Sequence, residues 1–283
     1  MSQSHPDQRS AAVKPCDPVW SEVRRQAEAI VAEEPALAGF IFTTILNQKS
    51  LEEAVVFRLA QRLDRADLPS ELIRQTFSQV LDEQPELGEM FRADLAAVVD
   101  RDPACHRAIE PILYFKGFHA LQSYRFAHAL WRAGRRDFAF YLQSQSSRVF
   151  GTDIHPNARI GRGIMLDHAT GLVVGETAVV GDQTSILHAV TLGGSGKEGG
   201  DRHPKIGCGV MIGAGAKILG NISVGDCARI AAGSVVLRDV DARVTVAGVP
   251  AKVVGLAGCP EPARAMNQLF GSIGSEPEEP AEE

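Results

Sequence analysis

The sequence has no uninterrupted apolar run of about 18 residues or more, so it contains no candidate for a membrane-spanning helix. It also lacks an excess of basic residues. Its formal net charge is −6, which argues against a nucleic-acid-binding protein. Residues 1–15 are polar and lack the apolar centre of a secretory signal, so we expect a cytoplasmic protein.

Cysteine is scarce and scattered. The chain has five, an odd number, and no two of them form a Cys-x-x-Cys pair, which argues against a disulfide framework and a zinc knuckle. The rest of the composition, with 45% hydrophobic and 23% charged residues, is that of an ordinary globular protein. The cysteines are Cys16, Cys105, Cys208, Cys227 and Cys259.

Composition divides the chain into a helical part and a glycine-rich part. Residues 19–149 contain little glycine and carry helix signals, such as the capping box Ser50-Leu-Glu-Glu53 ahead of apolar residues at helical spacing. Residues 150–258 are dominated by Gly, Val and Ile. We expect residues 1–18 and the acidic tail 259–283 to be disordered. The predicted fold class is α+β, an all-helical domain followed by a β domain.

An aliphatic residue recurs every six positions through the second part, and glycine commonly follows it. This is the hexapeptide repeat of a parallel β-helix, in which each unit forms one short strand and one corner. Three units form one coil. All thirteen repeat positions are aliphatic: Ile154, Ile160, Leu166, Val174, Val180, Ile186, Leu192, Ile206, Ile212, Ile218, Val224, Ile230 and Val236.

The six-residue spacing is broken twice. Leu166 and Val174 are eight residues apart, which adds two residues near His168. Leu192 and Ile206 are fourteen residues apart, again two beyond a multiple of six, across a glycine-rich stretch. Because extra residues cannot enter a stacked coil, we expect both stretches to protrude as loops, where solenoids commonly carry function.

His168 stands at the first break with an acid directly before it, which favours a functional role. Asp153 precedes it by 15 residues, so the two residues should lie on adjacent coils near one corner. A carboxylate that accepts a hydrogen bond from one imidazole nitrogen would leave the other nitrogen as a base. His188 lies inside a regular hexad, and we interpret it as an ordinary surface residue.

Other chemistries are less well supported. The stretch 193–200 does not match a phosphate-binding loop, so a flap over a bound molecule fits it better. No Gly-x-Ser-x-Gly elbow is present and Ser195 is a weak nucleophile candidate, which favours direct transfer without a covalent intermediate. Zinc can be held by three histidines, but the spacings here lack a close pair, and we expect no metal site. The histidines considered are His155, His168, His188 and His203.

Longer motifs resemble one family, the serine O-acetyltransferases of the hexapeptide-repeat acyltransferase superfamily. The resemblance covers roughly residues 20–255 and implies that the coils wind left-handed, against the usual rule for parallel crossovers. The motifs are Arg101-Asp-Pro-Ala104, Tyr114-Phe-Lys-Gly-Phe-His-Ala-Leu-Gln122, Asp153-Ile-His-Pro156, Gly161-Arg-Gly-Ile-Met-Leu-Asp-His-Ala-Thr-Gly171, Val190-Thr-Leu-Gly-Gly194, Gly200-Asp-Arg-His-Pro-Lys-Ile206 and Ala247-Gly-Val-Pro-Ala-Lys252.

The resemblance implies transfer of the acetyl group of acetyl-CoA to the hydroxyl of L-serine, in cysteine biosynthesis. His168 matches the family's general base, and Asp153 matches its orienting partner. Two carboxylates can pair with the serine ammonium, and a guanidinium can grip its carboxylate. The residues that match the amino-acid site are Asp102, Asp167, Arg202 and His203.

The resemblance also implies a homohexamer, a dimer of trimers, with residues 19–149 as the oligomerisation domain and L-cysteine as an inhibitor. Acetyl-CoA is then expected in a cleft between subunits, with no metal cofactor. The chain ends Pro280-Ala-Glu-Glu283 and lacks the terminal isoleucine that some members insert into cysteine synthase. We therefore expect no tight complex with that enzyme. The stretches matching the acetyl-CoA cleft lie around Gly194, Ala214, Ala232 and Lys252.

Two hypotheses compete with this interpretation. A hexapeptide acetyltransferase for homoserine, a sugar or a xenobiotic alcohol would keep His168 but would not need the clamp for an amino acid. A β-helix that serves only as a scaffold would be unaffected by replacing His168.

Overall fold

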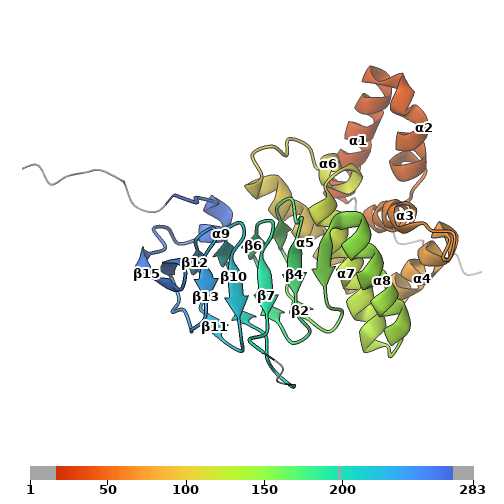
Figure 1. The fold of residues 1–283 in the computed structure, drawn as a ribbon. Coiled ribbons are helices and arrows are strands. Elements are labelled where there is room, and N and C mark those ends of the chain that lie inside the picture. The colour runs from red at the N-terminus through yellow and green to blue at the C-terminus, as the bar shows by residue number, and fades with distance from the viewer. Residues whose placement is uncertain (1–16, 197–198, 270–283) are drawn as a thin grey trace, which may run out of the picture.

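The computed structural model describes residues 17–196 and 199–269. The helices that precede the first strand gather at the end of the β-helix where the first strands lie, and the last strand, β15 (Ala251–Leu256), lies at the opposite end (Figure 1). The prediction of a helical region followed by a parallel β-helix is confirmed. Within the described residues, none of the helices combines the length and the hydropathy needed to cross a membrane.

From residue 17 onward, eight α-helices precede the first strand. At the start of α3 the Ser50 hydroxyl accepts a hydrogen bond from the Glu53 N–H at 3.3 Å, as in the predicted capping box, whereas the Glu53 carboxylate accepts one from the N–H of Lys49, not of Ser50, at 2.9 Å. A short π-helix, η2, follows α2. The bounds are α1 (Pro18–Glu33), η1 (Pro35–Leu37), α2 (Ala38–Ile41), η2 (Phe42–Leu46), α3 (Leu51–Leu63), α4 (Ser70–Glu83), α5 (Glu86–Arg101), α6 (Ile109–Leu113), α7 (Lys116–Arg132) and α8 (Arg136–Phe150).

The β-helix has three faces, which we name sheets A, B and C. Sheet A contains β1 (Thr152–Ile154), β4 (Leu172–Val174), β7 (Thr191–Gly193), β10 (Lys217–Leu219) and β13 (Val235–Val236). Sheet B contains β2 (Arg159–Ile160), β5 (Val179–Val180), β8 (Lys205–Ile206) and β11 (Ser223–Val224). Sheet C contains β3 (Met165–Leu166), β6 (Ser185–Ile186), β9 (Met211–Ile212), β12 (Arg229–Ile230), β14 (Val244–Gly248) and β15 (Ala251–Leu256).

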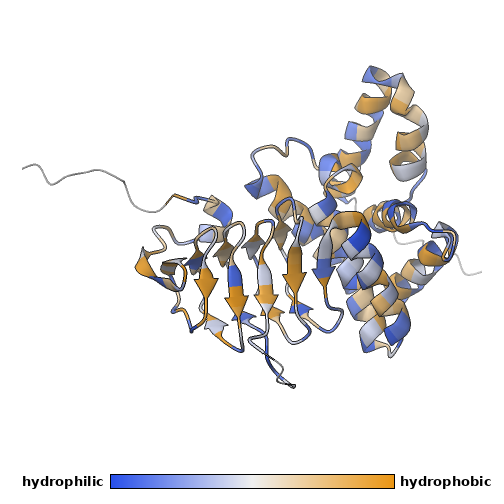
Figure 2. Ribbon diagram, viewed as in Figure 1, coloured by the Kyte–Doolittle hydropathy of each residue, from blue (hydrophilic) through white to orange (hydrophobic). Residues whose placement is uncertain are grey.

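The thirteen aliphatic repeat residues form the core of the β-helix. All of them are buried and belong to one contiguous hydrophobic cluster. Figure 2 shows hydrophobic residues recurring from strand to strand along the stack. The repeat is therefore explained by burial, because each hexad supplies one apolar side chain to the interior.

The strand register measures the two breaks in the repeat. Thr152 pairs with Leu172, twenty residues later, so the first coil has two residues more than the eighteen of a regular coil, as predicted. Thr191 pairs with Lys217, twenty-six residues later, so the second insertion has eight extra residues. The prediction of two extra residues there was wrong, because the chain passes over only one corner between Leu192 and Ile206, not two.

The helices are joined to the β-helix through buried contacts. Gly117 of α7 lies so close to β3 that a Cβ atom there would be 2.0 Å from the Leu166 carbonyl oxygen. The buried guanidinium of Arg125 forms two hydrogen bonds with the Asp94 carboxylate, at 2.7 and 2.9 Å, and donates to the Gly161 carbonyl at 2.8 Å. These contacts set the position of α5 and α7 against the first coil.

The predicted tail from residue 259 contains ordered structure. Helix α9 (Pro262–Ala265) buries Pro262 and Ala263, and Arg264 forms an ion pair with Asp100 of α5 at 2.8 Å. This part of the predicted disorder was wrong, because apolar contacts follow the last strand. At the other end, α1 begins at Pro18 with Asp17 as its N-cap. The rest of the predicted disorder, in residues 1–16 and 270–283, lies outside the described residues.

His119 gives the helical core a sensitivity to acid. It is buried in α7, and its Nε2 donates to the Ile112 carbonyl at 2.7 Å. Burial lowers the pKa of His119 to about 3, well below its ordinary value of 6.5. Below pH 6.5 the unfolded chain therefore binds a proton at this residue that the folded chain does not, so stability falls as the pH falls.

We expect His119→Gln to reduce this sensitivity. Glutamine keeps a donor for the Ile112 carbonyl but does not titrate. The unfolding free energy of the unmodified protein should fall by about 2 kcal/mol more than that of the variant between pH 7 and pH 5. Urea unfolding followed by circular dichroism measures both values. Equal losses in the two proteins would contradict the assignment.

Candidate active site

The first break in the repeat forms the corner between β3 and β4, which we name the C–A corner. His168 and Ala169 there have positive φ angles of 53° and 56°, a left-handed backbone that is uncommon for residues with a side chain. The corner is tied to both parts of the protein. Thr152 of β1 donates to the Ala169 carbonyl at 3.0 Å, and Lys116 of α7 hydrogen-bonds to the Thr170 hydroxyl. The side chain of His168 is thereby carried outward on a supported turn.

A cavity of about 290 Å³ lies beside the C–A corner. Asp102, directly after α5, lines it together with Asp167 and His168 of the corner. These three predicted residues come from distant parts of the chain, and the structure brings them together. The remaining lining is mostly apolar and includes Val98 and Met165.

The two carboxylates of this cavity influence each other. Asp102 Oδ1 accepts a hydrogen bond from the Ala104 N–H at 2.9 Å. Burial raises the pKa of Asp167, the nearby His168 opposes that shift, and the Asp102 carboxylate adds to it. A cation bound between the carboxylates would relieve their repulsion, so the cavity favours an ammonium group.

His168 is accessible at the mouth of the cavity. Its side chain is 75% exposed, and its Nε2 lies 3.8 Å from Asp167 Oδ1. The ring of His188, one coil further on, lies edge-on to it with 6.0 Å between the ring centroids. His188, interpreted from the sequence as an ordinary surface residue, is therefore a neighbour of the candidate base. The sequence did contain a signal for this: the first coil has twenty residues, and His188 follows His168 by twenty residues.

Asp153 has a different partner from the one predicted. Its Oδ1 accepts a hydrogen bond from Gln143 Nε2 of α8 at 2.6 Å. Within the described residues, no hydrogen bond or ion pair joins Asp153 to His168. The two segments are nonetheless in contact, because the hydroxyl of Thr152, directly before Asp153, donates to the carbonyl of Ala169, directly after His168.

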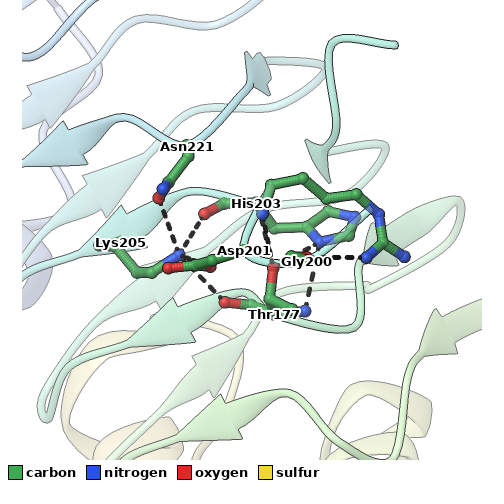
Figure 3. A network of polar contacts seen from close by, with 7 residues as sticks. Thr177, Gly200, Asp201, His203, Lys205 and Asn221 are labelled. Carbon is green, nitrogen blue, oxygen red and sulfur yellow. Dashed lines mark hydrogen bonds and ion pairs between the residues drawn. The ribbon is translucent and has the colours of Figure 1, made fainter. Parts of the chain in front are cut away.

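Arg202 and His203 lie at another corner, between sheets A and B, which we name the A–B corner. Arg202 Nη2 forms an ion pair with Glu176 Oε2 at 2.9 Å, and its Nη1 donates to the Gly200 carbonyl at 3.0 Å. The His203 ring is bound to Thr177 (Figure 3). Neither Glu176 nor Thr177 was singled out from the sequence, since both occupy ordinary corner positions in the repeat.

The two corners are at opposite edges of sheet A. Strand β4 crosses this sheet from the C–A corner to the A–B corner, and its three residues span roughly 10 Å. Within one chain, Arg202 and His203 are therefore separated from Asp102, Asp167 and His168. The six predicted residues form a cavity group, an A–B corner group and the separate Asp153.

Two of the four residues predicted to bind acetyl-CoA continue the C–A corner along the stack. The Gly215 N–H donates to the His188 carbonyl, and the Gly233 N–H donates to the Ala214 carbonyl, so successive corners are stacked. Ala214 and Ala232 therefore follow His188 in one column. Gly194 lies instead beside Arg202, and Lys252 is exposed on β15.

The four histidines considered for zinc do not meet at one point: His168 lies beside His188, and His155 and His203 lie at the A–B corner. His155 lies edge-on to Trp131 and Phe140, with ring centroids 5.3 and 5.6 Å apart, whereas His203 is bound to Thr177. Across residues 17–196 and 199–269, no group of three or more His, Cys, Asp or Glu side chains is arranged to hold a metal ion.

Comparison with known proteins points to one family. Residues 19–123 match the family model for the N-terminal region of serine acetyltransferase, and residues 203–238 match the model for the bacterial transferase hexapeptide repeat. The serine acetyltransferase of Salmonella typhimurium is 52% identical over 262 residues, which cover 92% of this chain and 96% of the relative.

Solved structures agree with this result. The serine acetyltransferase of Brucella abortus in complex with coenzyme A is 59% identical, with a TM-score of 0.86 over 88% of this chain and all of the relative. A serine acetyltransferase in complex with cysteine is 50% identical, with a TM-score of 0.88 over 89% of this chain and 98% of the relative. The likeness covers both the helices and the β-helix.

Proposed function

The chain belongs to the serine acetyltransferase family of acyltransferases, and from this premise we propose that it transfers acetyl directly from acetyl-CoA to L-serine, with His168 as general base. The observation that carries the proposal is the shared cavity of Asp102, Asp167 and His168. It combines two carboxylates for the serine ammonium with an accessible imidazole for the serine hydroxyl. Such an arrangement suits a small amino acid that carries an alcohol.

The carboxylate of serine needs a cation, and Arg202 is the predicted one. Arg202 and His203 lie across sheet A from the cavity in the same chain. We therefore propose that a neighbouring subunit supplies them, so that the C–A corner of one copy faces the A–B corner of the next. A ring of three copies closes such a head-to-tail contact, and two rings joined through their helices would give the expected hexamer.

Acetyl-CoA is proposed to lie along the column of C–A corners. Ala214 and Ala232 leave room for an extended arm next to the backbone, directly beyond His168 and His188. Gly194 of the neighbouring A–B corner would complete the cleft, and Lys252 would meet a phosphate. A thioester placed in this way is held close to the hydroxyl that attacks it, which converts the reaction into one between prepositioned groups.

The proposed reaction is a single acyl transfer. His168 takes the proton of the serine hydroxyl as its oxygen attacks the thioester carbonyl. The carbon–sulfur bond then breaks, and His168 returns the proton to the departing CoA sulfur. Asp153 is proposed to orient the imidazole. The pairing requires the exposed His168 side chain to rotate toward β1, and the two segments are already joined by the hydrogen bond from the Thr152 hydroxyl to the Ala169 carbonyl.

L-cysteine is proposed as a competitive inhibitor at the same cavity. It differs from serine only by sulfur in place of the hydroxyl oxygen, so Asp102, Asp167 and Arg202 would hold it equally well. A relative of 50% identity has been solved with cysteine, which supports the proposal.

A thiol-release assay tests the proposed function. With acetyl-CoA and L-serine we expect free CoA to appear, and L-cysteine should suppress it in competition with serine. Homoserine and a sugar, each supplied in place of L-serine at the same concentration, are the comparison acceptors. Equal turnover of serine and the sugar would overturn the proposal in favour of a different acetyltransferase, and no thiol release with any acceptor would favour a scaffold.

A further inference from the structure

The Thr177 side chain forms the centre of the A–B corner (Figure 3). Its hydroxyl oxygen accepts hydrogen bonds from the backbone N–H groups of Arg202 and His203, at 3.0 and 3.1 Å. The same oxygen lies 2.9 Å from Nδ1 of the His203 ring. One side chain is therefore in contact with the two predicted substrate-binding residues of this corner.

Counting donors and acceptors determines the state of His203. The backbone N–H of Thr177 points at Nδ1, with 3.2 Å between the nitrogens, and an N–H group can only donate. Nδ1 must therefore be the acceptor and carries no proton. The Thr177 hydroxyl is compatible with this state, since the N–H groups of Arg202 and His203 occupy both its lone pairs, and its one hydrogen is left for Nδ1 or for the Asp201 carboxylate.

We infer that His203 is held as the neutral Nε2–H tautomer and donates a hydrogen bond to a substrate oxygen, and that Thr177 is the positioning residue that sets this state. The inference deepens the proposed function and rests on it. It assigns the two histidines opposite tasks: His168 accepts a proton, whereas His203 offers one in a hydrogen bond. In the described part of the chain, Nε2 of His203 has no hydrogen-bond partner, so its N–H is available.

The ring is also held by packing. His203 is 7% exposed and lies against Gly175, where a Cβ atom would be 2.0 Å from the ring carbon Cδ2. At the same corner, the Lys205 ammonium donates to the carbonyls of Thr177 and His203 and to the carboxylate of Asp201 at 2.7 Å (Figure 3). The segment that carries the ring is thus fastened to the coil on both sides.

The charges around the ring agree with a neutral imidazole. Burial lowers the pKa of His203, and the guanidinium of Arg202 and the ammonium of Lys205 lower it further. Glu176 opposes them, but this carboxylate is already paired with Arg202. His155, the other titratable ring at this corner, also lowers the pKa of His203.

Nitrogen NMR of the purified protein, labelled at histidine, tests the tautomer without an activity measurement. At pH 7 we expect His203 to show a protonated Nε2 and an unprotonated Nδ1, assigned by comparison with His203→Gln. A proton on Nδ1, alone or in an imidazolium, would overturn the inference even if the enzyme acetylates serine.

Substitution of Thr177 tests the positioning role. Thr177→Ser keeps the hydroxyl, and we expect kcat/KM for serine within about twofold of the parent. Thr177→Val keeps the shape but not the hydrogen bonds, and we expect about a tenfold loss. Thr43→Val, which removes an exposed hydroxyl bonded only within its own helical segment, is the control. Equal activity of the Ser and Val variants would refute the role of Thr177.

Replacement of His203 separates a donor from a base. The amide nitrogen of glutamine reaches the place of Nε2, so His203→Gln should keep at least about tenfold more activity than His203→Ala. A base would be lost in both variants, so equally inactive variants would refute the donor role. Thermal unfolding confirms that each variant is folded. Absence of serine acetylation by the parent protein would instead refute the proposed function and leave the NMR result valid.

Discussion

Replacing His168 with alanine is expected to lower kcat for serine acetylation by at least about a hundredfold and to leave the fold intact. The imidazole is 75% exposed and adds little to the core, so its loss removes chemistry but not packing. Alanine is also tolerated by the backbone, because the next residue, Ala169, already has the same left-handed conformation.

The measurement is steady-state thiol release, with circular dichroism to confirm the fold. His106→Ala is the matched control, because His106 is exposed in the loop after α5 and does not line the cavity. If the kcat of His168→Ala is within about threefold of that of the parent, the general-base assignment is refuted. Either another residue is then the base, or the protein is a scaffold.

Introducing one methyl group at Gly175 is expected to raise the KM for serine by about thirtyfold or more. The Cβ of Gly175→Ala would lie 2.0 Å from Cδ2 and 2.1 Å from Nε2 of His203, so the ring must leave its place. The ring is bound to Thr177, which also holds the Arg202 backbone, so two of the four predicted contacts to the amino acid are disturbed. Gly175 has no left-handed backbone, so alanine brings no conformational strain of its own.

A second background shows whether the effect passes through His203. In His203→Ala there is no ring to displace, so adding Gly175→Ala should change the KM little further. Gly39→Ala, at a helical site with no atom within 4 Å of the new methyl group, is the control. If Gly175→Ala raises the KM for serine by the same factor with and without the His203 ring, the effect does not pass through His203.

The sequence predicted the β-helix well because its signal is local and repeated. Each hexad places one aliphatic residue in the interior, and all thirteen such residues are buried. The spacing also predicted correctly that the break after Leu166 adds two residues. The break after Leu192 was not predicted correctly, since spacing modulo six cannot tell two extra residues from eight, and only strand pairing shows which face Ile206 occupies.

The candidate site could be predicted only in part. Asp167 and His168 are adjacent in sequence and stand at a register break, so local information was enough for them. Asp102 joins them because α5 ends against the first coil, a contact that no spacing reveals. The pairing of Asp153 with His168 was predicted from coil arithmetic, but that arithmetic places backbones and not side chains, and Asp153 bonds to Gln143.

The sequence by itself indicated the architecture through aliphatic residues at a regular spacing, the family through longer motifs, and the candidate base through a break in that spacing. The tertiary structure decided which side chains share a cavity, which edge of sheet A carries Arg202, and which nitrogen of His203 bears the proton. The physical reason is the separation along the chain of the groups that interact. Burial repeats along the chain and can be read from it, whereas a hydrogen bond such as that between Thr177 and His203 joins groups 26 residues apart, and only the folded coils bring them within 3 Å.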